Sequence, residues 1–280
     1  MPAASGPRQR TEHATEGPPR AGTIGTYPAP AGTRHLRRAA RAGARPPREG
    51  APVTAPDTRI PSDDQLADLL PFWTDIGPAD RDELARHARV RRFAAGDMVQ
   101  GCGYGCTGVI FLRSGSLRAF MMSDQGKEIT LFRVEARECC VLAASCVLPQ
   151  ITFDLALSAE RDSELIAIDP ACFGRLAERE VHIEAFTYRQ ALERFSDCMW
   201  VMQQVLFMSF DRRLAVFLLD ELARTGSPTL AITHDQIARH LGSAREVVTR
   251  MLRYFASEGL IALSRGRIEV VDRAGLRALV

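Results

Sequence analysis

The middle of the chain alternates short apolar runs with turn residues. From Val90 to Leu165, runs rich in Val, Ile, Phe and Leu are separated by Gly and Asp. Strands of this length and spacing are typical of an all-β barrel or of a double-wound antiparallel roll. We therefore expect an antiparallel β domain in this part of the chain.

Helical periodicity appears on both sides of the predicted strands. Ser62 and Gln65 have the spacing of a helix capping box, and a second helix is expected at about Ala79 to His87. After Phe173, apolar residues recur at alternating steps of three and four, which is the seam of a coiled coil. This pattern predicts one long helix, over residues 183–209, that pairs with a second copy of itself. The residues expected in that interface are Leu192, Phe195, Met199, Met202 and Leu206.

The long helix also allows a second interpretation. Trp200, Val201, Val205 and Phe207 add apolar surface beyond the seam. Such residues would equally suit a single amphipathic helix that packs on the β domain of its own chain. The pattern alone leaves both arrangements open.

A helix-turn-helix is predicted near the end of the chain. Thr233 and Gln236 form one capping box, and Ser243 with Glu246 forms a second one after the turn at Gly242. Gly259 suits the position that ends the second helix. A three- or four-residue turn containing Gly between two short helices is the signature of this DNA-binding motif.

A short hairpin is predicted directly after the second helix. Leu260–Ser264 and Arg267–Val271 have strand character and flank Arg265-Gly266. The hairpin has the place of the wing in a winged helix. Its two arginines are plausible phosphate contacts, and solvent exposure without a partner explains them equally well.

The order of these elements resembles the Crp/Fnr family of bacterial transcription regulators. The motifs that carry the resemblance are Phe93-Ala-Ala-Gly96-Asp97, Ile110–Leu117, Gly126–Leu131, Ser163–Ile168 and the segment IARHLGSAREVVTRML at 237–252. The resemblance implies an α+β fold with an antiparallel β-roll (a double-wound jelly roll) as sensor domain, a long dimerisation helix and a winged helix-turn-helix. The expected boundaries are a basic arm at 1–60, the roll at 61–182, the dimerisation helix at 183–209 and the DNA-binding domain at 210–280.

The second helix of the motif carries side chains suited to the edges of base pairs. An arginine in the major groove can donate two hydrogen bonds to guanine, and a glutamate can accept one from cytosine N4. The resemblance assigns base contacts to Arg245, Glu246 and Arg250, although Glu246 could instead cap its own helix. The full set of candidate DNA contacts is Thr233, Ser243, Arg245, Glu246, Thr249 and Arg250.

The first sixty residues differ in composition from the rest. They hold ten Arg and four acidic residues among many Pro, Gly, Ala and Thr, without an apolar period. Such a segment buries too little surface to offset its ordering entropy, so we expect a disordered basic arm. The alternatives are an organelle transit peptide and an upstream start codon that cells do not use. The chain shows no secretory signal and no membrane span, so we expect a cytoplasmic protein.

Cysteines are concentrated in two stretches of the predicted roll. Cys139, Cys140 and Cys146 lie in RECCVLAASCV, and Cys102 and Cys106 lie in GCGYGCTG. Structural disulfides are rare in a reducing cytosol, so clustered thiols favour metal, cluster or redox chemistry. Four thiolates suffice for an iron–sulfur cluster. A thiol–disulfide switch, a haem ligated with His87 or His182, and burial as small apolar residues remain open.

Cyclic nucleotide binding is not expected. Nucleotide-binding members of the resembled superfamily carry a Gly-Glu cassette followed, after about ten residues, by an arginine and a hydroxyl residue that hold the phosphate. This chain has roughly Phe153 and Asp154 at those places, and a carboxylate repels a phosphate. Cys172 and Cys198, outside the cassette, are expected to be buried apolar residues.

The sequence thus predicts a transcription regulator rather than an enzyme. We expect a homodimer that binds a palindromic site in double-stranded DNA and is controlled by a redox or iron–sulfur signal at the cysteines. RNA polymerase is a further expected partner if the protein activates transcription. A regulator that responds to a small ligand or nucleotide, or to a thiol switch without metal, is the alternative.

Overall fold

The computed structural model describes residues 59–101, 107–144 and 155–280. Two helices, α2 (Asp63–Leu69) and α3 (Pro78–His87), precede the strands. Ser62 caps α2 with the predicted capping box, because its hydroxyl accepts from the backbone N–H of Gln65 while the Gln65 side chain accepts from the N–H of Ser62. The expected helix at 79–87 is confirmed as α3.

Within the described ranges, no helix is long and apolar enough to cross a membrane.

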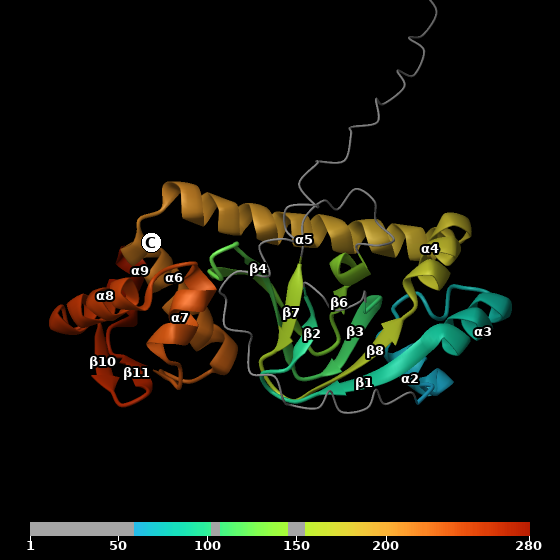
Figure 1. The fold of residues 1–280 in the computed structure, drawn as a ribbon, viewed down its shortest axis with the longest axis horizontal. Coiled ribbons are helices and arrows are strands. Elements are labelled where there is room, and N and C mark those ends of the chain that lie inside the picture. The colour runs from blue at the N-terminus through green and yellow to red at the C-terminus, as the bar shows by residue number, and fades with distance from the viewer. Residues whose placement is uncertain (1–58, 102–106, 145–154) are drawn as a thin grey trace, which may run out of the picture.

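Two four-stranded antiparallel sheets form the β-roll (Figure 1). In spatial order, the first sheet contains β1 (Ala88–Phe93), β8 (Ser163–Ile168), β3 (Val109–Ser114) and β6 (Cys139–Cys140). The second contains β2 (Met98–Gln100), β7 (Ala156–Ala159), β4 (Ser116–Met122) and β5 (Glu128–Glu135). The antiparallel roll expected from the strand spacing is therefore present.

One glycine shows how tightly the two sheets are joined. Gly115 connects β3 to β4 with a φ of +97°, a region that side chains rarely occupy. A Cβ at this position would also collide with Ser163 and with the carbonyl of Asp162. The Gly115 of the predicted landmark is thus required both by backbone conformation and by close packing against β8.

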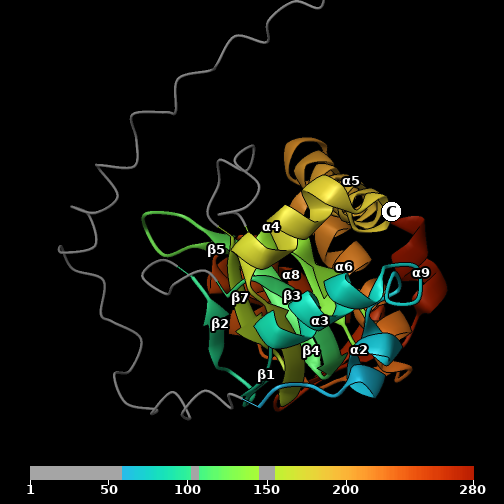
Figure 2. The ribbon, with the colours of Figure 1, turned by 90° about the vertical axis from the view of Figure 1, so that its right-hand side faces the viewer.

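Helices α4 (Pro170–Arg179) and α5 (Val181–Phe207) follow the roll. Figure 2, which looks nearly along α5, shows this helix on the outside of the roll. Ile183, Thr187 and Arg194 face inwards and are buried. The roll, α2 to α4 and the inner face of α5 share one apolar core.

The remaining elements form a second, smaller core around a winged helix. They are α6 (Phe210–Thr225), β9 (Thr229–Leu230), α7 (His234–Leu241), α8 (Arg245–Ser257), β10 (Ile261–Ser264), β11 (Arg267–Val270) and α9 (Arg273–Ala278). The hairpin of β10 and β11 is the wing predicted from the sequence, and β9 pairs with β11 as a third strand. The fold is therefore the expected α+β arrangement.

Candidate nucleic-acid interface

The recognition helix α8 is held in place by its apolar side. Val248, Leu252 and Phe255 are fully buried in the core of the winged helix. Gly242 ends α7 in the left-handed conformation, which lets the chain turn sharply into α8. Gly259 also has a positive φ, directly after the capping residue of α8. The predicted helix-turn-helix and both of its glycine positions are confirmed.

The predicted second capping box is wrong. Helix α8 begins at Arg245, its capping residue is Ala244, and no side chain caps it. Ser243 lies one residue before the cap, in the turn. A capping box joins the capping residue to the third residue of the helix. Because α8 starts later than expected, Ser243 is not the capping residue and Glu246 is only the second residue of the helix. Glu246 makes no capping hydrogen bond, but it lies in the first turn of α8, where a carboxylate also stabilises its own helix.

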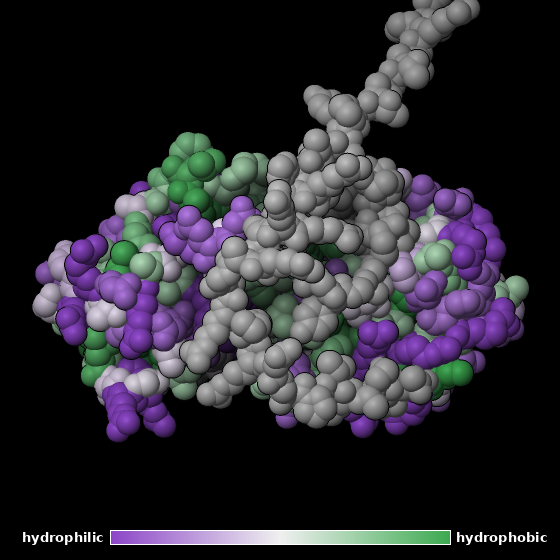
Figure 3. Space-filling view, in the orientation of Figure 1, coloured by the Kyte–Doolittle hydropathy of each residue, from purple (hydrophilic) through white to green (hydrophobic). Residues whose placement is uncertain are grey.

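The opposite side of α8 is exposed and polar. Arg245, Glu246 and Arg250 are exposed, while Thr249 is half-buried. Arg245 forms an ion pair of 3.5 Å with Asp235 on α7. Since both partners are more than half exposed, this pair is weak and a phosphate or a base can replace it. Figure 3 shows hydrophilic residues prevailing at the end of the molecule formed by α8 and the wing.

Two residues near this surface were not among the sequence candidates. His234, the first residue of α7, has its Nδ1 2.9 Å from Oγ1 of Thr249. Arg253 is exposed on α8, one turn beyond Thr249. The helical period would have placed Arg253 on the side of Glu246 and Arg250, whereas the contact of His234 depends on how α7 packs on α8.

Thr233 caps α7 as predicted. Its hydroxyl accepts from the N–H of Gln236 at 3.2 Å, and the Gln236 side chain accepts from the N–H of Thr233 at 2.8 Å. The hydroxyl of Thr233 is therefore already engaged. The first N–H groups of a helix have no partner within the helix and attract anions, so the start of α7 remains suited to a phosphate. Arg265 and Arg267 of the wing are exposed.

The roll touches the helix-turn-helix directly. Ile129 of β5 forms an isolated β-bridge with Leu241, at the end of α7, and lies against the turn at Gly242. Thr130 Oγ1 lies 2.8 Å from Nδ1 of His240. The tip of the β4–β5 hairpin thus packs against the turn that precedes the recognition helix.

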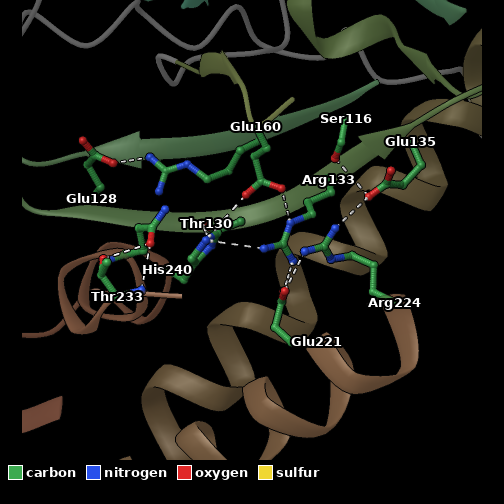
Figure 4. Close-up of polar contacts among 12 residues, drawn as sticks. Ser116, Glu128, Thr130, Arg133, Glu135, Glu160, Glu221, Arg224, Thr233 and His240 are labelled. Atoms are coloured by element: carbon green, nitrogen blue, oxygen red, sulfur yellow. Dashed lines mark hydrogen bonds and ion pairs between the residues drawn. The ribbon is translucent and has the colours of Figure 1, made fainter. Parts of the chain in front are cut away.

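Arg133 joins the two parts of the molecule (Figure 4). Its Nε donates to Glu160 of the roll at 2.7 Å, and its Nη1 lies 2.8 Å from Oε1 of Glu221 on α6, which is only 4% exposed. Burial lowers the pKa of His240 to about 2, and the positive charges of Arg133 and other nearby arginines add to this effect. The shift persists although a carboxylate oxygen of Glu160 lies 3.5 Å from the ring. Burial and the positive charges of the nearby arginines therefore keep His240 uncharged at neutral pH.

The outer side of α5 carries the predicted seam. Its five interface candidates are between 40% and 68% exposed: Leu192, Phe195, Met199, Met202 and Leu206. They do not pack on the roll of their own chain. Trp200, Val205 and Phe207 are also exposed. Figure 3 shows a hydrophobic patch at the carboxy-terminal end of α5, where this helix leads into α6.

The described cysteines are buried or half-buried. Cys139 and Cys140 form the edge strand β6 and are 4% and 0% exposed. Burial raises the pKa of both thiols, that of Cys140 to about 11, and Cys198 on α5 lies near enough to Cys140 to raise it further. Cys172 is fully buried, as predicted, whereas Cys198 is only half-buried. Cys102, Cys106 and Cys146 lie outside the described residues, as do Phe153 and Asp154.

The described residues do not by themselves make a metal site. Among them, no three His, Cys, Asp or Glu side chains come together as ligands. Burial raises the pKa of the Cys139 and Cys140 thiols in the metal-free protein, whereas iron and zinc bind the thiolate and deprotonate a thiol that coordinates them. Neighbouring residues of a strand point to opposite faces, so one of the two at most can join a common site. Such a site therefore depends on the cysteines beyond the described ranges.

Comparison with known proteins agrees with this architecture. Residues 212–279 match the model of the Crp-like helix-turn-helix domain. The transcriptional activator protein Anr of Pseudomonas aeruginosa is 26% identical over 78% of this chain and 91% of its own length. The cyclic AMP receptor protein of Thermus thermophilus is 23% identical over 75% of this chain and 96% of its own.

A solved structure gives the strongest support. A protein from Eubacterium rectale assigned to the Crp/Fnr family is 38% identical, with a TM-score of 0.72, over 75% of this chain and 98% of that one. The similarity thus extends through the roll, the long helix and the winged helix. The chain therefore belongs to the Crp/Fnr family and is a DNA-binding regulator of transcription rather than an enzyme.

Proposed function

We propose that the protein acts as a homodimer that binds a palindromic DNA site through two copies of α8. The observation that carries the proposal is the exposed apolar row on α5. Full burial of a Leu, Phe or Met side chain contributes about 1.5–3 kcal/mol, so pairing of this row across a twofold axis would stabilise a dimer. Sedimentation tests it directly: a species of twice the 30.9 kDa chain mass is expected. A monomer at micromolar concentration would contradict the proposal.

The proposed DNA contacts are divided between bases and phosphates. Arg245 and Arg250 would donate to guanine, and Glu246 would accept from cytosine N4. Their support is exposure on one side of a helix whose other side is anchored in the core. Thr249 would contact a base, and the turn at Ser243 and the start of α7 at Thr233 would lie along phosphates. RNA polymerase would be a further partner if the protein activates transcription.

We place the signal at the cysteines of the roll. One of Cys139 or Cys140, together with Cys102, Cys106 and Cys146, would hold an iron–sulfur cluster, which supplies an oxygen-sensitive iron centre when bound. The position of β6 supports this assignment, because it lies beside α5. Arg194 of α5, which is 8% exposed, forms an ion pair with Glu138 next to the cysteine pair. A chemical change at β6 would therefore reach the proposed dimerisation helix through a direct contact.

The signal is tested by purification without oxygen. A brown protein that contains iron and sulfide, and whose DNA affinity changes on exposure to air, is expected. If Cys140 is the ligand, Cys140→Ser should lose the iron and the change of DNA affinity on exposure to air. If Cys139 is the ligand, Cys139→Ser should lose both instead. Cys172→Ser, which changes a cysteine outside the cluster, should retain both.

Other results of the same purification favour other signals. A colourless protein whose affinity still changes on oxidation would replace the cluster by a thiol switch. Insensitivity to both iron and oxidants would leave a small ligand as the signal.

A further inference from the structure

The two helices of the DNA-binding motif are joined by a polar contact between side chains. Nδ1 of His234 on α7 lies 2.9 Å from Oγ1 of Thr249 on α8. The imidazole is part-buried, and the charged groups near it are Arg245 and Arg253 of α8 and Asp235 of α7. Burial and the two arginines lower the pKa of His234, so its ring is mostly uncharged at pH 7.

Thr249 has two groups that can recognise a base in different ways. Its hydroxyl can hydrogen-bond to several base edges, whereas its Cγ2 methyl group packs on the C5-methyl group of thymine. Because the side chain branches at Cβ, fixing one branch also fixes the other. With Oγ1 held by His234, the methyl group is the branch that remains for a base.

We propose that His234 is a positioning residue that makes Thr249 recognise thymine through its methyl group. The proposal rests on the proposed contact between Thr249 and a base, and it adds which base is preferred and why. His234 acts here through Thr249 and not by touching the base. If His234 served only as a phosphate ligand, its loss would weaken binding alike for every sequence.

Uracil, which is thymine without the C5-methyl group, provides the test. Each thymine of the selected half-site is replaced by dU in turn, and the affinity of the purified dimer is measured. At one position the wild type should bind dU about fourfold more weakly per substituted base, which corresponds to about 0.8 kcal/mol for one methyl-sized group. His234→Ala should bind the dT and dU duplexes equally at that position.

Substitutions at Thr249 separate this proposal from the contact on which it rests. Thr249→Val carries a methyl group on both branches, so it should distinguish dT from dU with or without His234. The double variant His234→Ala/Thr249→Val therefore also serves as a control. If it still distinguishes dT from dU, loss of His234 leaves a folded protein that binds DNA. Thr249→Ser has no methyl group and should bind both duplexes equally.

Each failure has its own signature. If Thr249→Ser keeps the wild-type ratio of dT to dU affinity, or if no position shows a ratio above one, the base contact of Thr249 is wrong. If Thr249→Ser loses the ratio but His234→Ala keeps it, the base contact stands and the positioning role of His234 is overturned. Equal weakening of both duplexes by His234→Ala, with the ratio unchanged, would likewise overturn it and leave a phosphate contact.

Discussion

Arg250 combines the features that recognition of a guanine requires. It is exposed on α8, and the helix that carries it is anchored by Val248 and Leu252. A guanidinium can donate two parallel hydrogen bonds to O6 and N7 of guanine, and loss of such a pair costs about 1–3 kcal/mol. We expect Arg250→Ala to weaken binding to the selected site by that amount and to relax the preference at one base pair.

Titration of matched DNA variants checks this prediction. Arg277→Ala removes the same charge from the exposed side of α9 and serves as control. It should change affinity little and leave the base preference intact. If the two variants weaken binding equally on all sequences, Arg250 contributes only general electrostatic attraction.

His240 makes the stability of the molecule depend on pH. Its pKa is lowered from 6.5 to about 2 in the folded protein, so the unfolded state binds a proton that the folded state does not. The stabilising effect of the neutral ring is fully present above pH 6.5 and is lost as the pH falls below that value. Between pH 7.5 and 5.5 we expect this group to lower the free energy of unfolding by about 1.4 kcal/mol.

Urea unfolding of the wild type and His240→Gln at both pH values measures this effect. The glutamine variant retains a polar, uncharged side chain and should lose less stability on acidification, by about 1.4 kcal/mol. An identical pH dependence of the two proteins would show that His240 takes up its proton equally in the folded and unfolded states.

Single residues also show where sequence patterns fail. The spacing of Ser243 and Glu246 satisfies a capping box, but α8 begins only at Arg245, with Ala244 as its capping residue. The capping box at Thr233 was predicted correctly because it depends only on a local four-residue segment. The contact between His234 and Thr249 joins residues fifteen positions apart on two different helices, and no local pattern indicates it.

At the scale of the element, the exposed apolar row on α5 is the proposed interface between the two subunits. We expect Met199→Glu to yield monomers, because two like charges would face each other across the twofold axis without compensation, at a cost of several kcal/mol. Gln203→Glu adds the same charge to the same helix beside the seam and should remain dimeric. Sedimentation that finds Met199→Glu still a tight dimer would place the interface elsewhere.

The strands and helices themselves were largely predictable. Alternation of apolar runs with turn residues located the roll, and the three-and-four spacing located α5. The spatial order of the strands was not predictable from this pattern, because β1 pairs with β8 and β3 with β6, which are distant in sequence. The apolar period also left open which side of α5 faces the roll. Arg194 decides this, since it is buried against Phe132 and Glu138.

At the scale of the whole molecule, the junction around Arg133 connects the sensor domain with the DNA-binding domain. Arg133, Glu160 and Glu221 come from β5, the end of β7 and α6, so no sequence motif unites them. Breaking one partner of such a buried pair is costly, because it leaves a charge without compensation. The junction therefore holds the helix-turn-helix against the roll.

Selection of binding sites from random DNA by the purified protein tests the central claim most directly. A twofold dimer with two copies of α8 should select an inverted repeat whose half-sites lie about one helical turn apart, each with G·C pairs at the positions contacted by Arg245 and Arg250. Recovery of unrelated sequences, or of a single half-site without its symmetric partner, would contradict the proposal of a dimer that recognises DNA through α8.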